Sequence, residues 1–245
     1  GRLSQPPSAD LAPEMIAFCD DPAVIGCEFY VMARIEGLIL RRNPPRDLVL
    51  TPEVTRQLCL NAIDTLVALH GVRIEGTPLA DIGKGVGYAR RQIAGWCDRY
   101  RKARTWNVAR FEGVMNWLEA HVPDDVAATV IHNDFRFDNM VLDPTDPTRI
   151  VGVLDWEMAT IGDPLMDLGN ALAYWVQKDD DFFIRALRRQ PTHLPGMLTR
   201  REVVEHYCAR TGRTVSNWTF YEVYGLFRLA VIAQQIYYRY QRGES

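Results

Sequence analysis

Residues 129–170 constrain this chain more than any other stretch, because hard oxygen ligands follow strand and turn signals there in close succession. An apolar run ends at His132 and brings Asp134 into a loop, and Asn139 and Asp155 flank a segment with the pattern of a β-hairpin. Two short apolar runs separated by aspartates and prolines predict its strands, residues 140–142 and 150–154. Asn139 and Asp155 should therefore lie side by side at the open end of the hairpin, with Asp134 on the same edge.

These three side chains suit phosphoryl transfer to a hydroxyl group. That reaction needs a base for the hydroxyl proton and a metal ion that neutralises the phosphate charges. Asp134 would be the base, and the side-chain oxygens of Asn139 and Asp155 are ligands that Mg²⁺ accepts. A glycoside hydrolase with Asp134 and either Asp155 or Glu157 as its acid pair is an alternative interpretation, which leaves the amide of Asn139 unexplained.

Four motifs in order at suitable spacing resemble a known family. The segment from His132 to Asn139 fits the kinase catalytic-loop pattern HxDxxxxN, and Asp155 stands where protein kinases carry the aspartate of DFG. FYVM at residues 29–32 and GDPLMDLGN at residues 162–170 support the match. The chain resembles the aminoglycoside phosphotransferase and choline kinase superfamily. More narrowly, it is similar to the phosphotransferase-family domains found alone in bacteria or fused to acyl-CoA dehydrogenases.

The resemblance implies an ATP- and Mg²⁺-dependent kinase that transfers the γ-phosphate to an alcohol hydroxyl of a small substrate. Asp134 would be its base, and Asn139 and Asp155 would bind Mg²⁺. Glu157 matches a second acid of choline-kinase relatives, and it would contact metal or water or else form only a local hydrogen bond. Arg136 would neutralise the transferring phosphate, because its planar fork suits phosphate oxygens.

The resemblance also assigns nucleotide-binding and structural residues. The strand at Met32 would lead into the hinge between two lobes, with Met32 as gatekeeper and the backbones of Ala33 and Ile35 bonding the adenine edge. His132 would pack beneath the catalytic loop, and Asp167 resembles the acid that holds the backbone of that loop.

The implied fold is α+β and protein-kinase-like, with a mostly helical C-lobe that contains the catalytic β-hairpin. A complete N-lobe has a Gly-rich phosphate loop and a strand lysine before the hinge, but only a short segment without lysine precedes Phe29. We therefore expect the N-lobe sheet to be largely missing from the chain, with residues 1–36 as its remnant with the hinge and residues 37–245 as the C-lobe. Weak ATP binding and little transfer would follow. The alternative function is a non-catalytic nucleotide-binding or scaffold module of the same fold.

The composition limits the kinds of partner that the chain is expected to bind. The chain has 245 residues, 47% of them hydrophobic, which is enough for a full core. Its net charge of −3 and the lack of a basic cluster interleaved with aromatic residues argue against nucleic acid as a partner. No apolar run approaches the roughly 20 residues of a membrane span, and no signal pattern opens the sequence. We expect a cytoplasmic protein with no membrane partner; the oligomeric state is not indicated.

Periodicity and cap signals predict the remaining elements. A strand pair is expected within residues 15–35, with the second strand at residues 28–35. Helices are expected at residues 52–69, 88–104, 110–121, 164–175, 180–189, 200–211 and 217–239. His70, after the first of these helices, is interpreted as a cap or packing residue.

The sequence leaves the phosphate acceptor open. A cationic acceptor such as an aminoglycoside would favour an acidic pocket. Around the fifth predicted helix, residues 180–189, the chain offers both an acidic run, residues 179–181, and the arginines Arg185, Arg188 and Arg189. The composition does not indicate whether the acidic or the basic residues would face the acceptor.

Overall fold

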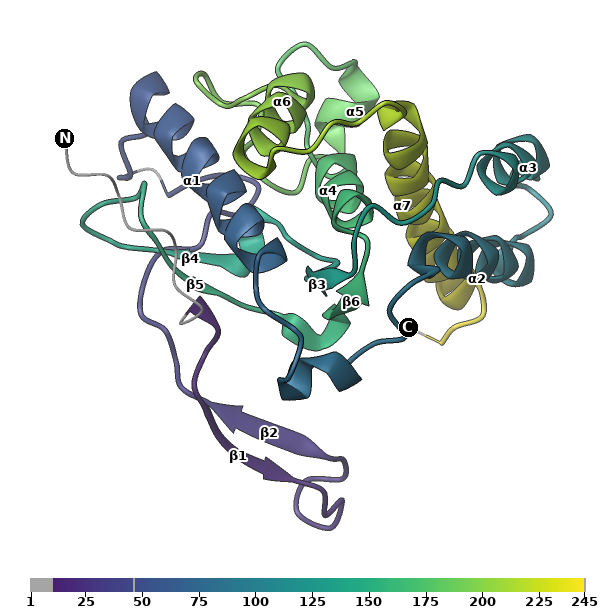
Figure 1. The fold of residues 1–245 in the computed structure, drawn as a ribbon, viewed down its shortest axis with the longest axis horizontal. Helices are drawn as coiled ribbons and strands as arrows, with labels where there is room; N and C mark the ends of the chain where they lie inside the picture. Colours follow the sequence, from purple (N-terminus) through teal and green to yellow (C-terminus); the bar gives the residue numbers. More distant parts are fainter. Residues whose placement is uncertain (1–10, 46, 245) are drawn as a thin grey trace. The chain divides into compact units, whose positions relative to one another are not determined.

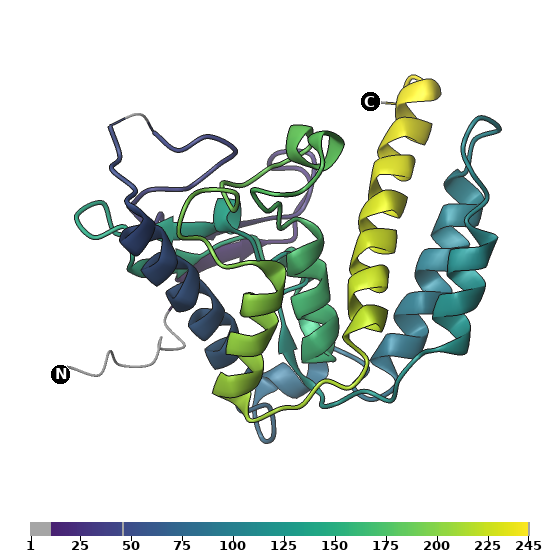
Figure 2. The ribbon, with the colours of Figure 1, turned by 90° about the horizontal axis from the view of Figure 1, so that it is seen from above.

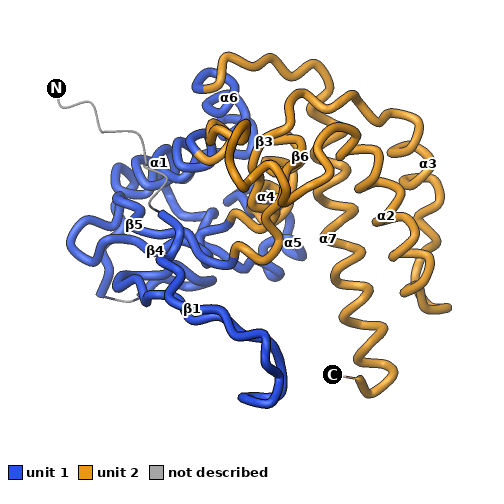
Figure 3. Tube along the Cα trace, turned by 60° about the horizontal axis from the view of Figure 1, so that its bottom comes forward, with its two compact units in different colours: residues 1–68, 136–155, 176–210 blue, residues 69–135, 156–175, 211–245 orange. Residues whose placement is uncertain are grey.

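A computed structural model describes residues 11–45 and 47–244 (Figure 1). Residues 1–10 of the predicted N-lobe remnant lie outside this described part. The chain forms two compact units, each assembled from three segments (Figure 3). Unit 1 comprises residues 1–68, 136–155 and 176–210, and unit 2 comprises residues 69–135, 156–175 and 211–245. The predicted division into lobes after residue 36 falls inside unit 1 and stays a prediction.

Unit 1 begins with the predicted antiparallel strand pair. β1 (Met15–Cys19) pairs with β2 (Phe29–Met32). The second strand ends at Met32 and not at Ile35 as predicted, because the chain then leaves β1. It instead reaches β4, where Leu38 and Leu142 exchange both backbone hydrogen bonds, 2.7 and 2.8 Å long.

The predicted hairpin follows in the same unit. β4 (Met140–Leu142) pairs with β5 (Ile150–Val153) in an antiparallel register. Asp143 and Asp146 stabilise the connecting turn by accepting hydrogen bonds from Thr145 and from Thr148. Such side-chain bonds to the nearby backbone are the reason why aspartates predict turns.

The segment after β2, where the hinge is predicted, packs on this hairpin. A side chain at Gly152 of β5 would collide with Ile35, and one at Gly37 would collide with Val141 and the carbonyl of Leu142. Glycine therefore permits the close approach of the segment after β2 to the sheet.

Unit 1 also holds α5 (Phe182–Ala186) and nearly all of α1 (Pro52–His70) and α6 (Arg200–Thr211). The backbone of Val54 donates to Thr51 Oγ1 over 3.3 Å, so Thr51 caps α1 as its position predicts. The predicted helix at residues 180–189 was too long. Asp180 accepts from the backbone of Gln177 and pairs with Arg200, and Asp181 caps the short helix that remains.

Unit 2 is mainly helical, and its long C-terminal helix α7 (Trp218–Gln241) runs beside α2 (Tyr88–Ala103) and α3 (Glu112–Ala120) (Figure 2). α7 also crosses α4 (Pro164–Ala173), where Gly169 faces the backbone of Tyr221 and Gly225 faces the backbone of Gly169. The two helices approach so closely because glycine stands at their crossing. No helix in the described ranges has both the length and the apolarity to cross a membrane.

A short strand pair completes unit 2. β3 (Thr129–Ile131) pairs with β6 (Thr160–Gly162). β3 was expected as the apolar run before His132, whereas β6 was not predicted. Three residues carry too little periodicity to indicate a strand, and its partner lies far away in sequence.

Candidate active site

The hairpin brings Asn139 and Asp155 together at its open end, within unit 1. Met140 pairs with Val153, and the Leu154 backbone donates to the Asn139 carbonyl over 2.8 Å. Asn139 is buried in a short 3-10 turn (Phe137–Asn139), and Asp155 is exposed directly after the second strand. The turn chemistry of the hairpin therefore fixes the neighbourhood of the two predicted metal ligands.

Asp155 has an unusual backbone conformation. Its φ is +65°, in the left-handed region that residues other than glycine rarely adopt. Aspartate tolerates this region better than most residues, at some cost in free energy. Residues in such sparsely populated backbone conformations cluster at functional sites, because the surrounding structure must hold them there.

The donor atoms of this pair fit Mg²⁺. Both residues offer hard oxygen atoms, which is the ligand type that Mg²⁺ prefers. Within residues 11–45 and 47–244, no group of three or more His, Cys, Asp or Glu side chains could hold a metal ion by itself. A Mg²⁺ ion at Asn139 and Asp155 would thus take its other ligands from phosphate and water, which is how this ion is bound beside transferring phosphates.

The predicted base, Asp134, lies in unit 2 on a loop that a buried carboxylate holds. Asp167 on α4 accepts hydrogen bonds from the backbones of His132, over 2.8 Å, and Asn133, over 2.7 Å. Nε2 of His70 lies 3.1 Å from the same carboxylate. Asp167 is fully buried, so it is a scaffold for the catalytic loop, as the sequence indicated.

The side chain of Asn133 fixes the loop further. Its backbone is left-handed, with φ of +65°, and its Oδ1 accepts from the hydroxyl of Tyr88 over 3.0 Å and from the amide of Asn170 over 3.2 Å. Its own amide donates to the carbonyl of Met158. Sequence analysis missed these partners, because they come from α2, α4 and the segment before β6 and have no spacing in common with Asn133.

His132 has the structural role that was predicted. It is fully buried, and its ring packs against Trp156 with 4.8 Å between centroids. The backbone N–H of Asp134 donates to Nδ1 of His132 over 3.2 Å. The lone pair of Nδ1 therefore supports the loop itself and does not serve proton abstraction from a substrate.

Two buried carboxylates of unit 2 have opposite pKa shifts. Burial raises the pKa of Asp167, but its interactions with His70 and His132 outweigh burial, so the net pKa lies below its ordinary value. Asp163 caps α4 by accepting from Leu165 and Met166, and burial leaves its pKa above the ordinary value. Asp167 is thus held as the anion that its three donors require.

Arg136 and Glu157 lie in different units. Arg136 belongs to unit 1, where its guanidinium pairs with Asp138 over 3.4 Å. Glu157 is exposed on a 3-10 turn (Trp156–Met158) of unit 2. The phosphate role of Arg136 and the metal role of Glu157 stay predictions.

The predicted hinge residues lie in unit 1, at the end of β2 and directly after it. Met32 is exposed over 42% of its surface, and Ala33 and Ile35 are half-buried. The N–H of Ala33 donates to the carbonyl of Glu14 over 2.8 Å, so a bond from Ala33 to adenine would use its carbonyl oxygen. Nucleotide binding at these residues also stays a prediction.

Comparisons with known proteins agree with this description. Residues 6–203 match the model of a phosphotransferase enzyme family. Acyl-CoA dehydrogenase family member 11 of Homo sapiens is 34% identical over 240 residues, which are 95% of this chain and 30% of the human protein. Acyl-CoA dehydrogenase family member 10 of Mus musculus is 32% identical over 235 residues, 95% of this chain and 22% of the mouse protein. The chain thus spans less than a third of these relatives.

Solved structures show the same fold. A provisionally named aminoglycoside phosphotransferase from Ralstonia eutropha JMP134 superposes with a TM-score of 0.81 at 30% identity, covering 97% of this chain and 71% of that one. The ternary complex of APH(2")-IIa with streptomycin and ATP has a TM-score of 0.56 at 14% identity and covers 99% of this chain and 74% of that one. The second likeness concerns the fold alone.

Proposed function

Because the chain belongs to the phosphotransferase enzyme family, we propose that it is a small-molecule kinase that transfers the γ-phosphate of ATP, with Mg²⁺, to an alcohol hydroxyl. The observation that carries this proposal is the pair Asn139 and Asp155 at the open end of the β4–β5 hairpin. The donor type suits Mg²⁺ beside phosphate oxygens, and the left-handed backbone of Asp155 indicates that its position is held at a cost.

Different residues of the chain would bind the metal ion, take the proton and support the loop. Asn139 and Asp155 would hold Mg²⁺, which neutralises phosphate charge when bound. Asp134 would orient the acceptor hydroxyl and take its proton at the carboxylate. Five residue steps separate Asp134 from Asn139, so even a fully extended chain would place their Cα atoms at most about 18 Å apart. Asp167 would keep the loop backbone in place during turnover, because it accepts hydrogen bonds from the backbones of both residues before Asp134 and is itself held by His70.

The proposal is tested by nucleotide binding to Asp155→Asn. The substitution keeps the size of the side chain but removes its charge, so it should weaken Mg²⁺-ATP binding by at least about 10-fold, the effect of losing roughly 1.4 kcal/mol. Isothermal titration calorimetry with a non-hydrolysable ATP analogue, with Mg²⁺ and with EDTA, measures this change.

Asp146→Asn is the matched control. Asp146 lies at the turn end of the same hairpin, where its carboxylate accepts from the backbone and hydroxyl of Thr148. The affinity of the Asp146→Asn variant for Mg²⁺-nucleotide should equal that of the wild type. Equal affinities of wild type, Asp155→Asn and Asp146→Asn in the presence of Mg²⁺ would refute the metal assignment.

A further inference from the structure

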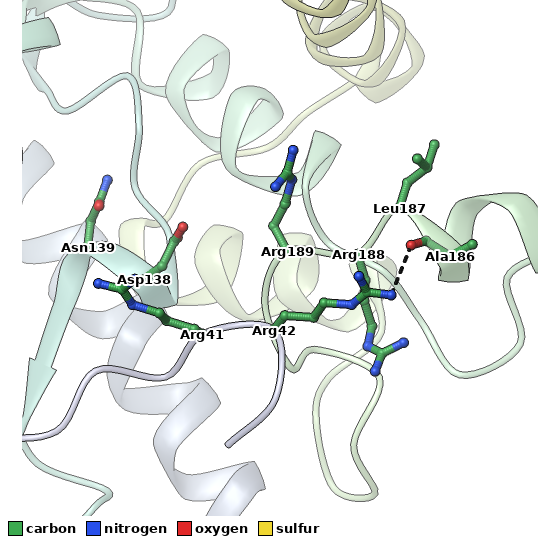
Figure 4. Close-up of a pocket in the computed structure, with 8 residues that line it drawn as sticks. All are labelled: Arg41, Arg42, Asp138, Asn139, Ala186, Leu187, Arg188 and Arg189. Carbon is green, nitrogen blue, oxygen red and sulfur yellow. Dashed lines mark hydrogen bonds between the residues drawn. The ribbon is translucent and has the colours of Figure 1, made fainter. Parts of the chain in front are cut away.

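Unit 1 contains a cavity with four arginines at its wall. The cavity has a volume of about 640 Å³, and its lining includes Asp138 and Asn139 of the catalytic loop (Figure 4). Its arginines come from two distant segments, Arg41 and Arg42 after the hinge and Arg188 and Arg189 after α5. The cavity therefore adjoins a predicted metal ligand, although most of its wall is formed by residues with no assigned role.

The positive charge of this cavity is not neutralised by neighbouring carboxylates. In the described ranges, none of the four arginines has a carboxylate oxygen within 4.0 Å, and Arg42 and Arg188 donate hydrogen bonds to neutral groups. Asp138 faces the cavity, but its carboxylate pairs with Arg136. Four guanidinium groups around one cavity repel each other, and an anion in the cavity would relieve that repulsion.

The arginine segments are fixed in place. Arg42 donates to the carbonyl of Ala186 over 3.3 Å (Figure 4), and Arg188 donates to the side chain of Asn43 over 3.0 Å. The buried Gln190 accepts from the backbone of Phe137 over 2.9 Å, which joins the second segment to the turn that carries Asn139. Hydrogen bonds thus hold Arg42 and Arg188 in the wall, and the segments that also carry Arg41 and Arg189 are fixed to other parts of unit 1.

The acidic run that could have balanced these arginines is used elsewhere. Asp180 forms a two-pronged ion pair with Arg200, with both distances 2.7 Å, and Asp181 caps α5. Asp179 accepts from the side chain of Gln177. Burial lowers the pKa of His193, and the positive charges of Arg188 and Arg185 lower it further.

We propose that this cavity binds an anionic group, phosphate or carboxylate, on the alcohol that accepts the phosphoryl group. The inference rests on the proposed kinase function and names its substrate class. Arginine forks match such groups with paired hydrogen bonds. The nucleotide's own phosphates would be neutralised by the Mg²⁺ that Asn139 and Asp155 would hold, so four further cations exceed what they need. A polycationic acceptor would meet four like charges.

The test uses inorganic pyrophosphate and malonate as probes, titrated into the protein in EDTA by calorimetry. Arg41→Gln combined with Arg189→Gln removes two exposed arginines that form no hydrogen bond or ion pair with other described residues. At least one probe should bind wild type saturably, and the variant should bind that probe at least about 10-fold more weakly, as expected for loss of charge-assisted bonds. Which probe binds more tightly distinguishes phosphate from carboxylate as the preferred group.

The control is Arg73→Gln combined with Arg90→Gln, which removes the same charge from exposed positions of unit 2 outside the cavity. It should change probe affinity by no more than about twofold. Arg42→Gln combined with Arg188→Gln provides a second cavity variant, with circular dichroism to check its fold. Equal probe affinity in wild type and the cavity variants, or an equal loss in the control, would overturn the proposal.

Two further measurements separate this proposal from others. Asp155→Asn should lose Mg²⁺-nucleotide affinity but keep its metal-free probe affinity, so failure of the metal site and failure of the anion site give different results. Probe and Mg²⁺-nucleotide should bind wild type together. Mutual exclusion, or loss of Mg²⁺-nucleotide affinity in the Arg41 and Arg189 variant equal to its loss of probe affinity, would assign the arginines to the nucleotide phosphates and refute an acceptor site.

Discussion

At the scale of residues, one buried carboxylate does more for the catalytic loop than any of the predicted catalytic groups. Asp167 is fully buried and accepts from His132 and Asn133 while lying beside His70. An amide in its place has one acceptor oxygen and would present N–H groups to backbone N–H groups. We expect Asp167→Asn to lower the free energy of unfolding by about 3 kcal/mol, the cost of leaving a buried donor unsatisfied and losing a charged acceptor. Urea denaturation measures this loss.

Asp98→Asn is a suitable control for that experiment. Asp98 forms an exposed pair with Lys102 one turn away on α2. Pairs of this kind contribute only a few tenths of a kcal/mol, so stability should barely change. A similar small effect for Asp167→Asn would mean that the loop does not depend on this carboxylate.

Asp134→Asn tests the base at the same scale. The amide keeps the size of the side chain but cannot accept the hydroxyl proton, so turnover should fall by about 10²-fold or more. Nucleotide affinity should change little. Steady-state release of ADP in the presence of an acceptor gives the rate, with Asp124→Asn, just upstream of the loop strand, as a control. Near-normal turnover of the Asp134 variant would support the scaffold interpretation.

At the scale of elements, the contact between α4 and α7 depends on the absence of two side chains. A Cβ at Gly225 would collide with the backbone of Gly169. Alanine favours helices over glycine by about 1 kcal/mol, but overpacking at a helix crossing costs typically 1–3 kcal/mol and more where backbone must move. Gly225→Ala should therefore destabilise unit 2 on balance, as measured by thermal unfolding.

Gly95→Ala gives the opposite expectation. Gly95 lies inside α2, and its added Cβ would meet only the flexible end of Arg99 at 3.5 Å, an ordinary contact. Here the helix propensity should dominate and the melting temperature should rise. If both substitutions stabilised the protein, the close crossing of α4 and α7 would be contradicted.

At the scale of the whole molecule, stability should decline in acid through carboxylates in both units. The pKa of Asp167 in unit 2 and of Asp180 in unit 1 lies below the ordinary value, the second mainly because of its hydrogen bond with Arg200. A depressed folded-state pKa gives stability that is complete above the unfolded value of about 3.9 and is lost as pH falls through the folded value. The raised pKa of Asp163 acts with the opposite sign, since its protonated form favours folding.

We therefore expect the urea midpoint to be nearly constant from about pH 7 to 5 and to fall below about pH 4. Asp180→Asn should lower the midpoint at neutral pH and make the acid decline shallower, because that carboxylate no longer titrates. A midpoint that rises as pH falls from 4 to 3, measured by fluorescence at constant ionic strength, would contradict the depressed values.

The sequence by itself determined the local parts of this protein. Turn aspartates placed the β4–β5 hairpin and with it Asn139 beside Asp155, and caps and periodicity placed the long helices with errors of a few residues at their ends. Turns, caps and helices depend on interactions between residues that are close in the chain, so they can be predicted from the order of the residues. The motifs between His132 and Asn170 indicated the family, which the match over residues 6–203 confirms.

Only the tertiary structure decided which polar residues remain for a ligand. The sequence offered an acidic run and several arginines near one another, and it could not choose between them. Folding uses Asp180 for Arg200 and Asp181 for the start of α5, and it brings Arg41 and Arg42 to Arg188 and Arg189 from across the chain. It also supplies the unpredicted β6 and the partners of Asn133. The physical reason is that the interaction between two charges depends on the distance between them in space. For residues far apart in the sequence, that distance is set by the packing of the whole unit and not by their spacing in the sequence.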